Sequence, residues 1–176
     1  MVIDIARHDP AWPERFRAEA AKLTGLLEPW LATPVEHIGS TSVPGLAAKP
    51  ILDMMAGVHD LHSARDAIPV LTSHGYTHAQ HRPATLWFHK ARTENDLEQA
   101  LHLTEPGSSL WRERLAFRDA LRADPVLARQ YEELKERLAA DCGDLAAYTA
   151  GKREFVVQVL ARAGVIAEQW RQAGRH

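Results

Sequence analysis

The sequence has a single cysteine, Cys142, so no disulfide can form within the chain. A lone cysteine is typical of proteins in reducing compartments, where disulfides are rare. No apolar run approaches the ~20 residues that a membrane helix needs, and the first five residues already include an acid, unlike a signal peptide. We therefore expect a cytoplasmic protein that does not enter a membrane.

The chain also lacks a surplus of positive charge. Its 21 Lys and Arg are balanced by 23 Asp and Glu, for a net charge of -2. Proteins that bind duplex DNA usually carry a basic surplus, because phosphate contacts supply much of their affinity, so we expect no duplex DNA partner. Repeats and low-complexity segments are missing too, and the length predicts one domain over residues 1–176.

Apolar periodicity divides this domain into a mixed part, 1–105, and a helical part, 106–176. The first helix is expected over 13–31, with Pro13 in its first turn and Pro34 beyond its end. The remaining expected elements are strands at 35–38, 51–58, 76–79, 86–89 and 100–104, and helices at 60–73, after Ser108, after Asp124 and over 151–172, with a loop at 143–151. This order predicts an α+β fold.

Between the first two strands lies a turn rich in hydroxyls, Gly39-Ser40-Thr41-Ser42. Backbone N–H groups and hydroxyls at the end of a strand can hold an anion such as phosphate. The turn is not a Walker-type loop, since the spacing from Gly39 to Gly45 is one residue too long and no lysine follows Gly45. An ordinary tight turn is the alternative interpretation.

Lys49 and Asp53 follow this turn. Alternation along the strand places Ile51, Asp53 and Met55 on one face. A carboxylate inside an apolar run is unusual unless it is paired or binds a cation, and carboxylate oxygen is the ligand that Mg²⁺ prefers. The alternatives are an edge strand with a wet face for Asp53, and a lysine that merely reaches into water for Lys49.

Residues 36–53, with the sequence EHIGSTSVPGLAAKPILD, strongly resemble the GrpB family. Further matching segments are Asp9-Pro10-Ala11-Trp12, His102-Leu103, Glu105-Pro106-Gly107-Ser108, Phe117-Arg118-Asp119, Leu121-Arg122, Tyr148-Thr149 and Gly151-Lys152. That family is assigned to the nucleotidyltransferase superfamily that includes DNA polymerase β, and a related domain is fused to dephospho-CoA kinase. The resemblance implies a nucleotidyltransferase-like mixed β-sheet flanked by helices and followed by a C-terminal helical segment.

The superfamily pattern is a Gly-Ser turn, a strand with Asp-x-Asp, and a third carboxylate on a neighbouring strand. Gly39-Ser40 matches the turn and Asp53 the first carboxylate, but Met55 stands at the second acidic position. A thioether cannot hold Mg²⁺, whereas two-metal phosphoryl transfer needs carboxylates around both ions. Candidate substitutes are Glu36, Glu98 and Glu105, and His102 lies on the strand that would supply the third position, as a metal ligand, a base or a core histidine.

Cationic side chains in the helical part complete the predicted site. Arg114, Arg118 and Arg122 recur every four residues and share a helix face. Such a face is often just solvated, but the resemblance favours Arg118 as a phosphate ligand. Lys152, after Gly151, is expected either to close over a nucleotide from the start of the last helix or to be merely exposed.

Two functions follow. In the first, Mg²⁺ on Asp53 assists transfer of a nucleoside monophosphate from an NTP to an acceptor. The catalytic residues would be Asp53 and His102, and the substrate-binding residues would be Gly39, Ser40, Thr41, Ser42, Lys49, Arg118 and Lys152. The alternative, motivated by Met55, is a non-catalytic module that binds a nucleotide or a phosphorylated metabolite.

Overall fold

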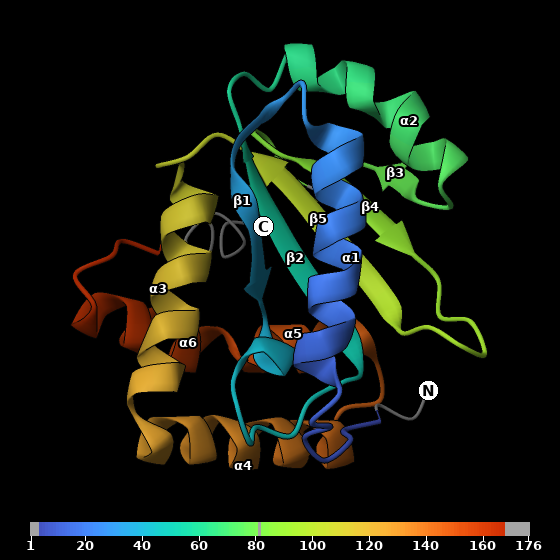
Figure 1. The fold of residues 1–176 in the computed structure, drawn as a ribbon. Coiled ribbons are helices and arrows are strands. Elements are labelled where there is room, and N and C mark those ends of the chain that lie inside the picture. Colours follow the sequence, from blue (N-terminus) through green and yellow to red (C-terminus); the bar gives the residue numbers. More distant parts are fainter. Residues whose placement is uncertain (1–3, 81, 168–176) are drawn as a thin grey trace.

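The computed structural model describes residues 4–80 and 82–167 of the chain (Figure 1). Its elements are α1 (Trp12–Leu27), β1 (Leu31–Ile38), η1 (Ser40–Ser42), β2 (Ile51–Val58), η2 (Ser63–Asp66), α2 (Ala67–Ser73), β3 (Thr77–Ala79), β4 (Leu86–Lys90), β5 (Glu98–Thr104), α3 (Ser109–Ala123), α4 (Pro125–Asp141), α5 (Leu145–Gly151) and α6 (Arg153–Arg162). Up to residue 167, the last one described, β5 is followed by helices and no further strand, so the predicted α+β class, a mixed sheet followed by a helical segment, is confirmed.

The five strands form one mixed sheet in the order β1-β2-β5-β4-β3. β2 and β5 run parallel, and their register places Met55 opposite His102. β1 is antiparallel to β2, with Ile38 opposite Asp53. The residue that precedes the Gly-Ser turn is therefore the direct neighbour of the predicted metal ligand.

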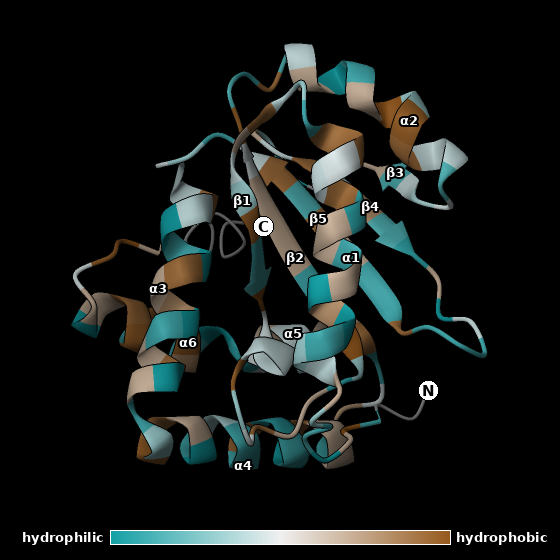
Figure 2. Cartoon of the chain, viewed as in Figure 1, coloured by the Kyte–Doolittle hydropathy of each residue, from teal (hydrophilic) through white to brown (hydrophobic). Residues whose placement is uncertain are grey.

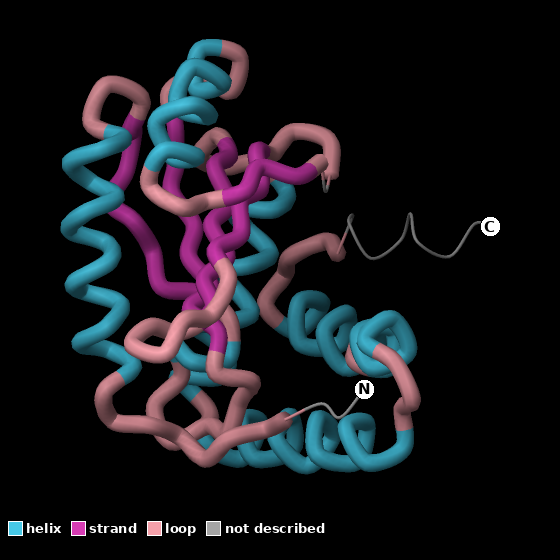
Figure 3. Tube along the Cα trace, turned by 90° about the vertical axis from the view of Figure 1, so that its right-hand side faces the viewer, coloured by secondary structure: helices cyan, strands magenta, loops and turns pink. Residues whose placement is uncertain are grey.

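The two faces of β2 bury different partners, as the alternation predicts. Met54 and Ala56 pack with Leu23 of α1 in the largest apolar cluster, and Figure 1 shows α1 crossing this face with α2 beside it. On the opposite face Met55 is fully buried against Ile38 and Leu110 of α3. Figure 3 shows the strands lying between α1 and the C-terminal helices.

Two side-chain caps fix the helical part. The Ser108 hydroxyl accepts a hydrogen bond from the N–H of Trp111 (3.2 Å) at the start of α3, and the Asp124 carboxylate accepts one from the N–H of Val126 (2.9 Å) at the start of α4. Both helices thus begin directly after the predicted positions, Ser108 and Asp124, and each of these residues caps its helix. Because a proline follows Asp124 directly, α4 can begin without losing an intrahelical hydrogen bond.

α4 also holds the segment between the turn and β2. The Glu132 carboxylate accepts a hydrogen bond from the N–H of Ala47 (2.7 Å), and the buried Lys135 ammonium donates to the carbonyl of Ala47. Both hydrogen-bonding groups of this one peptide residue are thus satisfied by the same helix.

Several boundaries differ from the prediction. α1 ends at Leu27 and β1 begins at Leu31, so the expectation that Pro34 lies outside the strand is wrong. β1 is an edge strand whose register shifts between Leu31 and Val35, and an edge position needs no N–H from proline. The loop expected at 143–151 contains α5, whose first turn Asp144 caps. The last helix ends at Arg162, and its expected residues 168–172 lie outside the described residues.

Figure 2 shows hydrophilic and hydrophobic residues alternating around the helices, as expected for helices that bury one side only. Within the described residues, no helix combines the length and apolar character needed to cross a membrane.

Candidate functional site

The turn after β1 lies directly against Asp53. Gly39 has a positive φ of 72°, and a Cβ added to it would come within 2.3 Å of the Asp53 Oδ2 atom. Glycine is required here twice over, by its backbone conformation and by the absence of room for a side chain. Two of the predicted residues, Gly39 and Asp53, thus meet in space, with Ser40 as the next residue of the turn.

The remaining hydroxyls of the turn are used inside the protein. Ser42 Oγ donates to the Gly39 carbonyl (2.6 Å), and Thr41 Oγ1 donates to the Ile51 carbonyl (2.9 Å). Because that hydroxyl proton is committed, Thr41 Oγ1 accepts from the Nε2–H of His37 (3.0 Å). Thr41 and Ser42, predicted to bind substrate, are placed here to hold the turn in shape.

His37 supports this arrangement from beneath the turn. Burial, aided by Arg122 and Arg118, lowers the pKa of His37 to about 4, so the ring is neutral near pH 7. The ring also stacks on Phe16 of α1 at a centroid distance of 4.5 Å. Burial and stacking fix the imidazole, which in turn fixes Thr41.

Two arginines of α3 clamp the turn from the other side. Arg118 Nη1 donates to Glu36 (2.6 Å) and to the carbonyl of His37 (3.2 Å), and its Nε donates to Asp119 (2.7 Å). Arg122 Nε donates to the Ser42 carbonyl (3.0 Å). The guanidinium of Arg118, predicted to bind phosphate, is therefore neutralised by two carboxylates and positions β1 and the turn.

Cations from three different parts of the chain act electrostatically on Asp53. Burial raises the pKa of Asp53 to about 6, although Arg114, Lys152 and Lys49 act in the opposite direction and Glu98 adds to the rise. Burial lowers the pKa of Lys152 to about 8, opposed by Asp53 and reinforced by Lys49 and Arg114. Three positive groups and one partly neutralised carboxylate make a local environment suited to an anion.

Lys152 reaches this position because of the break between α5 and α6. A Cβ on Gly151 would lie 2.4 Å from the Leu138 side chain, so the chain approaches α4 closely at this point. The ammonium of Lys152 lies over the ring of Tyr148, 4.4 Å from its centroid. Close packing thus explains the position of Lys152 at the N-terminus of the last helix, and its role toward a nucleotide stays a prediction.

A pocket of about 220 Å³ opens beside this cluster. Its lining residues are Arg82, Glu113, Arg114, Phe117, Tyr131, Thr149, Lys152, Val156 and Leu160. One wall is aromatic: the Phe117 ring meets the Tyr131 ring edge-on at 5.1 Å. Burial raises the pKa of the Tyr131 hydroxyl, which hydrogen-bonds the Ser40 side chain, so the phenol stays neutral and ties the turn to the pocket.

Arg82, Arg114 and Tyr131 were not singled out by the sequence. Arg114 shares the periodic face of Arg118 one helical turn earlier, so the pattern contained it without distinguishing it. Tyr131 was assigned to a buried helix face, which is correct, but its hydroxyl reaches the site. Arg82 follows no pattern, and only the fold brings it close.

The candidate carboxylates do not form a two-metal site. Glu36 is paired with Arg118, and Glu105 accepts from the N–H of Leu61 (3.2 Å). Glu98 lies opposite Ile51 on β5 and is the one substitute that acts on Asp53. Within the described part of the chain, no group of three His, Cys, Asp or Glu side chains could hold a metal ion. The residues fit at most one Mg²⁺ on Asp53, completed by phosphate oxygens and water, as that ion often is.

Comparison with known proteins matches the GrpB protein family over residues 2–162. The "UPF0157 protein" of Deinococcus radiodurans is 37% identical over 165 residues, which cover 92% of this chain and 82% of that protein. The "UPF0157 protein PA4798" of Pseudomonas aeruginosa is 38% identical and is covered over 67% of its length, with 92% of this chain included.

Comparison with solved structures leads to the same family. The conserved protein GrpB from Enterococcus faecalis superimposes with a TM-score of 0.81 at 29% identity, covering 91% of this chain and 96% of that one. The Cid1 poly(U) polymerase bound to Mg 3'-dATP gives a TM-score of 0.56 at 14% identity, covering 85% of this chain and 50% of the polymerase. At that identity the likeness establishes the fold alone, which is nucleotidyltransferase-like. With the family model matching nearly its whole length and these relatives beside it, the chain belongs to the GrpB family.

Proposed function

We propose that the chain is a nucleotidyltransferase that binds the phosphates of an NTP at Asp53 and transfers the nucleoside monophosphate to an acceptor. The single observation that carries this proposal is the contact between Gly39 and Asp53 beside a pocket lined by Arg82, Arg114 and Lys152. A cation-lined pocket next to a glycine turn and one carboxylate supplies what a polyphosphate needs.

The size of the pocket decides which part of the nucleotide it would hold. Pockets for whole drug-sized ligands measure about 300–1,000 Å³, and this one measures about 220 Å³. It therefore suits the phosphate chain, with the sugar and base extending out of it. Binding an anion would also favour the charged form of Lys152, whose pKa burial now holds at about 8.

In the proposed reaction an acceptor oxygen attacks the α-phosphorus. A bond forms between those two atoms while the bond from the α-phosphorus to the oxygen bridging the β-phosphorus breaks, and its electron pair leaves with pyrophosphate. Lys49, Arg114 and Lys152 would offset the charge that moves onto the leaving group. His102, on β5 opposite Met55, would accept the proton of the acceptor.

Mg²⁺ bound by Asp53 would polarise the phosphate and neutralise part of its charge. With Met55 buried in the second acidic position, the cations of α3 and of the α5–α6 junction are proposed to do the work of a second ion. Two Cid1 structures of this fold are bound to Mg 3'-dATP and to MgGTP, which supports testing magnesium nucleotides first.

The test is binding and turnover with each NTP and Mg²⁺. We expect a rise in melting temperature on adding the correct nucleotide, and release of pyrophosphate with a labelled product when cell extract supplies the acceptor. Lys152→Met should weaken binding at least tenfold, since a charge-assisted contact contributes about 1.5–3 kcal/mol. Lys22→Met, at an exposed lysine of α1, is the matched control. A flat thermal response to all four nucleotides would refute the proposal.

Met55 favours a second candidate, a module that binds a nucleotide or phosphorylated metabolite without turning it over. Its apolar surroundings of Ile38 and Leu110 leave no place for a second carboxylate at that position. Thermal stabilisation by a magnesium nucleotide, without pyrophosphate or labelled product in any extract, would decide for this candidate.

A further inference from the structure

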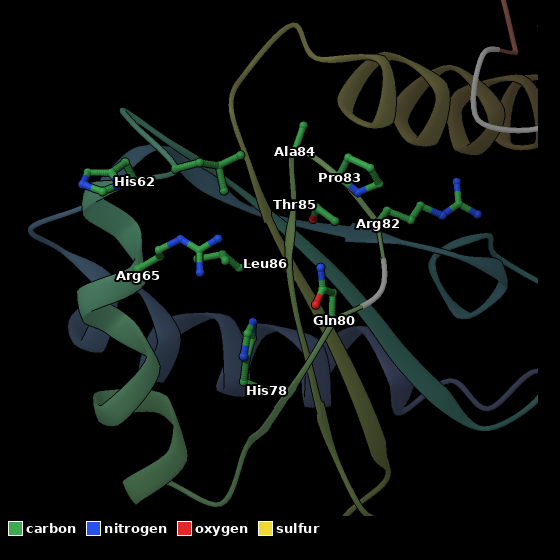
Figure 4. A pocket seen from close by; sticks show the side chains of 10 residues that line it. His62, Arg65, His78, Gln80, Arg82, Pro83, Ala84, Thr85 and Leu86 are labelled. Carbon is green, nitrogen blue, oxygen red and sulfur yellow. The ribbon is translucent and has the colours of Figure 1, made fainter. Parts of the chain in front are cut away.

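A second pocket, of about 400 Å³, opens on the α2 side of the sheet (Figure 4). Its lining residues are Leu61, His62, Arg65, His78, Gln80, Arg82, Pro83, Ala84, Thr85 and Leu86. His78 pairs with Phe88, whose side chain belongs to the core between the sheet and α1 and α2. The pocket therefore faces away from Asp53, although Arg82 lines both pockets.

Local structure explains why the polar side chains of this pocket converge. The Asp60 carboxylate accepts hydrogen bonds from the N–H (2.7 Å) and hydroxyl (2.6 Å) of Ser63, which shapes the start of η2. His62 and Arg65 are three residues apart across this 3₁₀ turn, the spacing that aligns side chains there. His78 and Gln80 are two residues apart on an extended segment and share its face.

Figure 4 shows the side chains of Arg65, His78 and Gln80 pointing toward a common space, while Arg82 points away from His62 and Arg65. Within the described part of the chain, the side chains of Arg65 and Gln80 make no hydrogen bond or ion pair. A half-buried or exposed donor without a protein partner is available to a ligand at no cost in broken contacts.

Among the described residues, none that lines this pocket is an acid. Two carboxylates bonded to residues next to or within the lining are already used: Asp60 holds Ser63, and Glu105 accepts from the N–H of Leu61. The Arg65 guanidinium, with no carboxylate among these lining residues, disfavours a metal cation and attracts an oxyanion, to which the two histidines can donate hydrogen bonds. The volume falls in the range of small-metabolite sites.

We propose that this pocket is a separate binding site for a phosphate-bearing small molecule, with the Arg65 guanidinium as the principal phosphate ligand. His62, His78 and Gln80 donate further hydrogen bonds to the phosphate oxygens. The Pro83–Leu86 wall, which contains no charge, contacts the carbon skeleton of the molecule. The site is independent of the nucleotide chemistry proposed at Asp53.

The experiment is calorimetric titration with inorganic phosphate and with ribose 5-phosphate as probes, and neutral ribose as the control ligand. It is run in the Lys152→Met background, so that phosphate bound beside Asp53 does not contribute. We expect binding of both anions and none of ribose. The double variant His62→Gln/Arg65→Gln should bind at least tenfold more weakly, whereas Arg92→Gln, on an exposed loop arginine, should match the parent.

A second readout locates the ligand directly. The imidazole proton resonances of His62 and His78 should shift on adding ribose 5-phosphate in both the wild type and the Lys152→Met protein. Anion binding that disappears with Lys152→Met, or that persists unchanged in the His62→Gln/Arg65→Gln protein, would overturn the proposal, as would no binding at millimolar concentration. Failure of NTP binding at Asp53 leaves these outcomes unaffected.

Discussion

Replacing Asp53 by asparagine should make the free protein more stable. Burial raises the pKa of Asp53 from 3.8 to about 6, so the ionised carboxylate is less favourable in the folded than in the unfolded chain. A shift of this size corresponds to about 3 kcal/mol at pH 8, and contact of the half-buried group with water reduces this to about 2 kcal/mol. Asparagine has the same shape and carries no charge.

The pH dependence gives the sign of the effect. A carboxyl group whose folded-state pKa is raised costs stability once it ionises, so the penalty is complete above about pH 6 and absent below about pH 4. Asp53→Asn should therefore unfold at higher urea concentration than the wild type at pH 8, and the difference should shrink as the pH falls toward 4.

The assay is urea unfolding followed by circular dichroism at several pH values, with Asp4→Asn as the matched control at an exposed aspartate. The control should change stability by less than about 0.5 kcal/mol. If Asp53→Asn proved less stable than the wild type at pH 8, or if its effect were the same at every pH, the assignment of Asp53 as a desolvated carboxylate held beside cations would be wrong.

Three further predictions concern the frame of the site, and chemical denaturation checks each. Gly39→Ala should destabilise the protein by more than about 3 kcal/mol, because the added Cβ would clash with Asp53. The control is Gly45→Ala, which has a similar φ of 77° but nothing within 4 Å of the added Cβ and should cost only about 1 kcal/mol. Equal losses of stability in the two variants would contradict the close contact between Gly39 and Asp53. Arg118→Met should cost about 2–3 kcal/mol because Glu36 and the His37 carbonyl lose their donor, and a neutral result would mean that the clamp contributes nothing. Asp124→Ala should cost about 1 kcal/mol through the lost cap of α4, and no loss would show that Pro125 alone begins the helix.

The sequence predicted those parts of the fold in which the structural effect of a residue does not depend on its neighbours in space. Alternation along β2 separated Met54 and Ala56 from Asp53 and Met55 because one face is wholly apolar. The prediction that Pro34 lies outside the strand was wrong, because the missing N–H of proline matters only where a neighbouring strand needs that donor. The sequence does not show that β1 is an edge strand. A short helix such as α5 buries little, so its periodicity is weak despite its cap.

The sequence predicted only those residues of the site that lie close together along the chain. Gly39 directly follows β1 and Asp53 lies on β2, and these two strands follow each other and pair, so their proximity follows from a short connection. Arg114 and Lys152 come from elements 61 and 99 residues beyond Asp53, and packing alone brings them there. Periodicity placed three arginines of α3 on one helix face. Which of them faces the site depends on how α3 is rotated against β1, and the sequence does not give that rotation. The ion pair of Arg118 with Glu36 shows it in the structure.

The hydrogen bonds from α4 to Ala47 bear on how the molecule forms during synthesis. All the strands are synthesised before α4, and Ala48 of the segment that joins the turn to β2 already has a partner in Ala6. The N–H and carbonyl of the neighbouring Ala47 gain their partners only when α4 docks, so the final shape of this connection to the strand of Asp53 would be set late in synthesis.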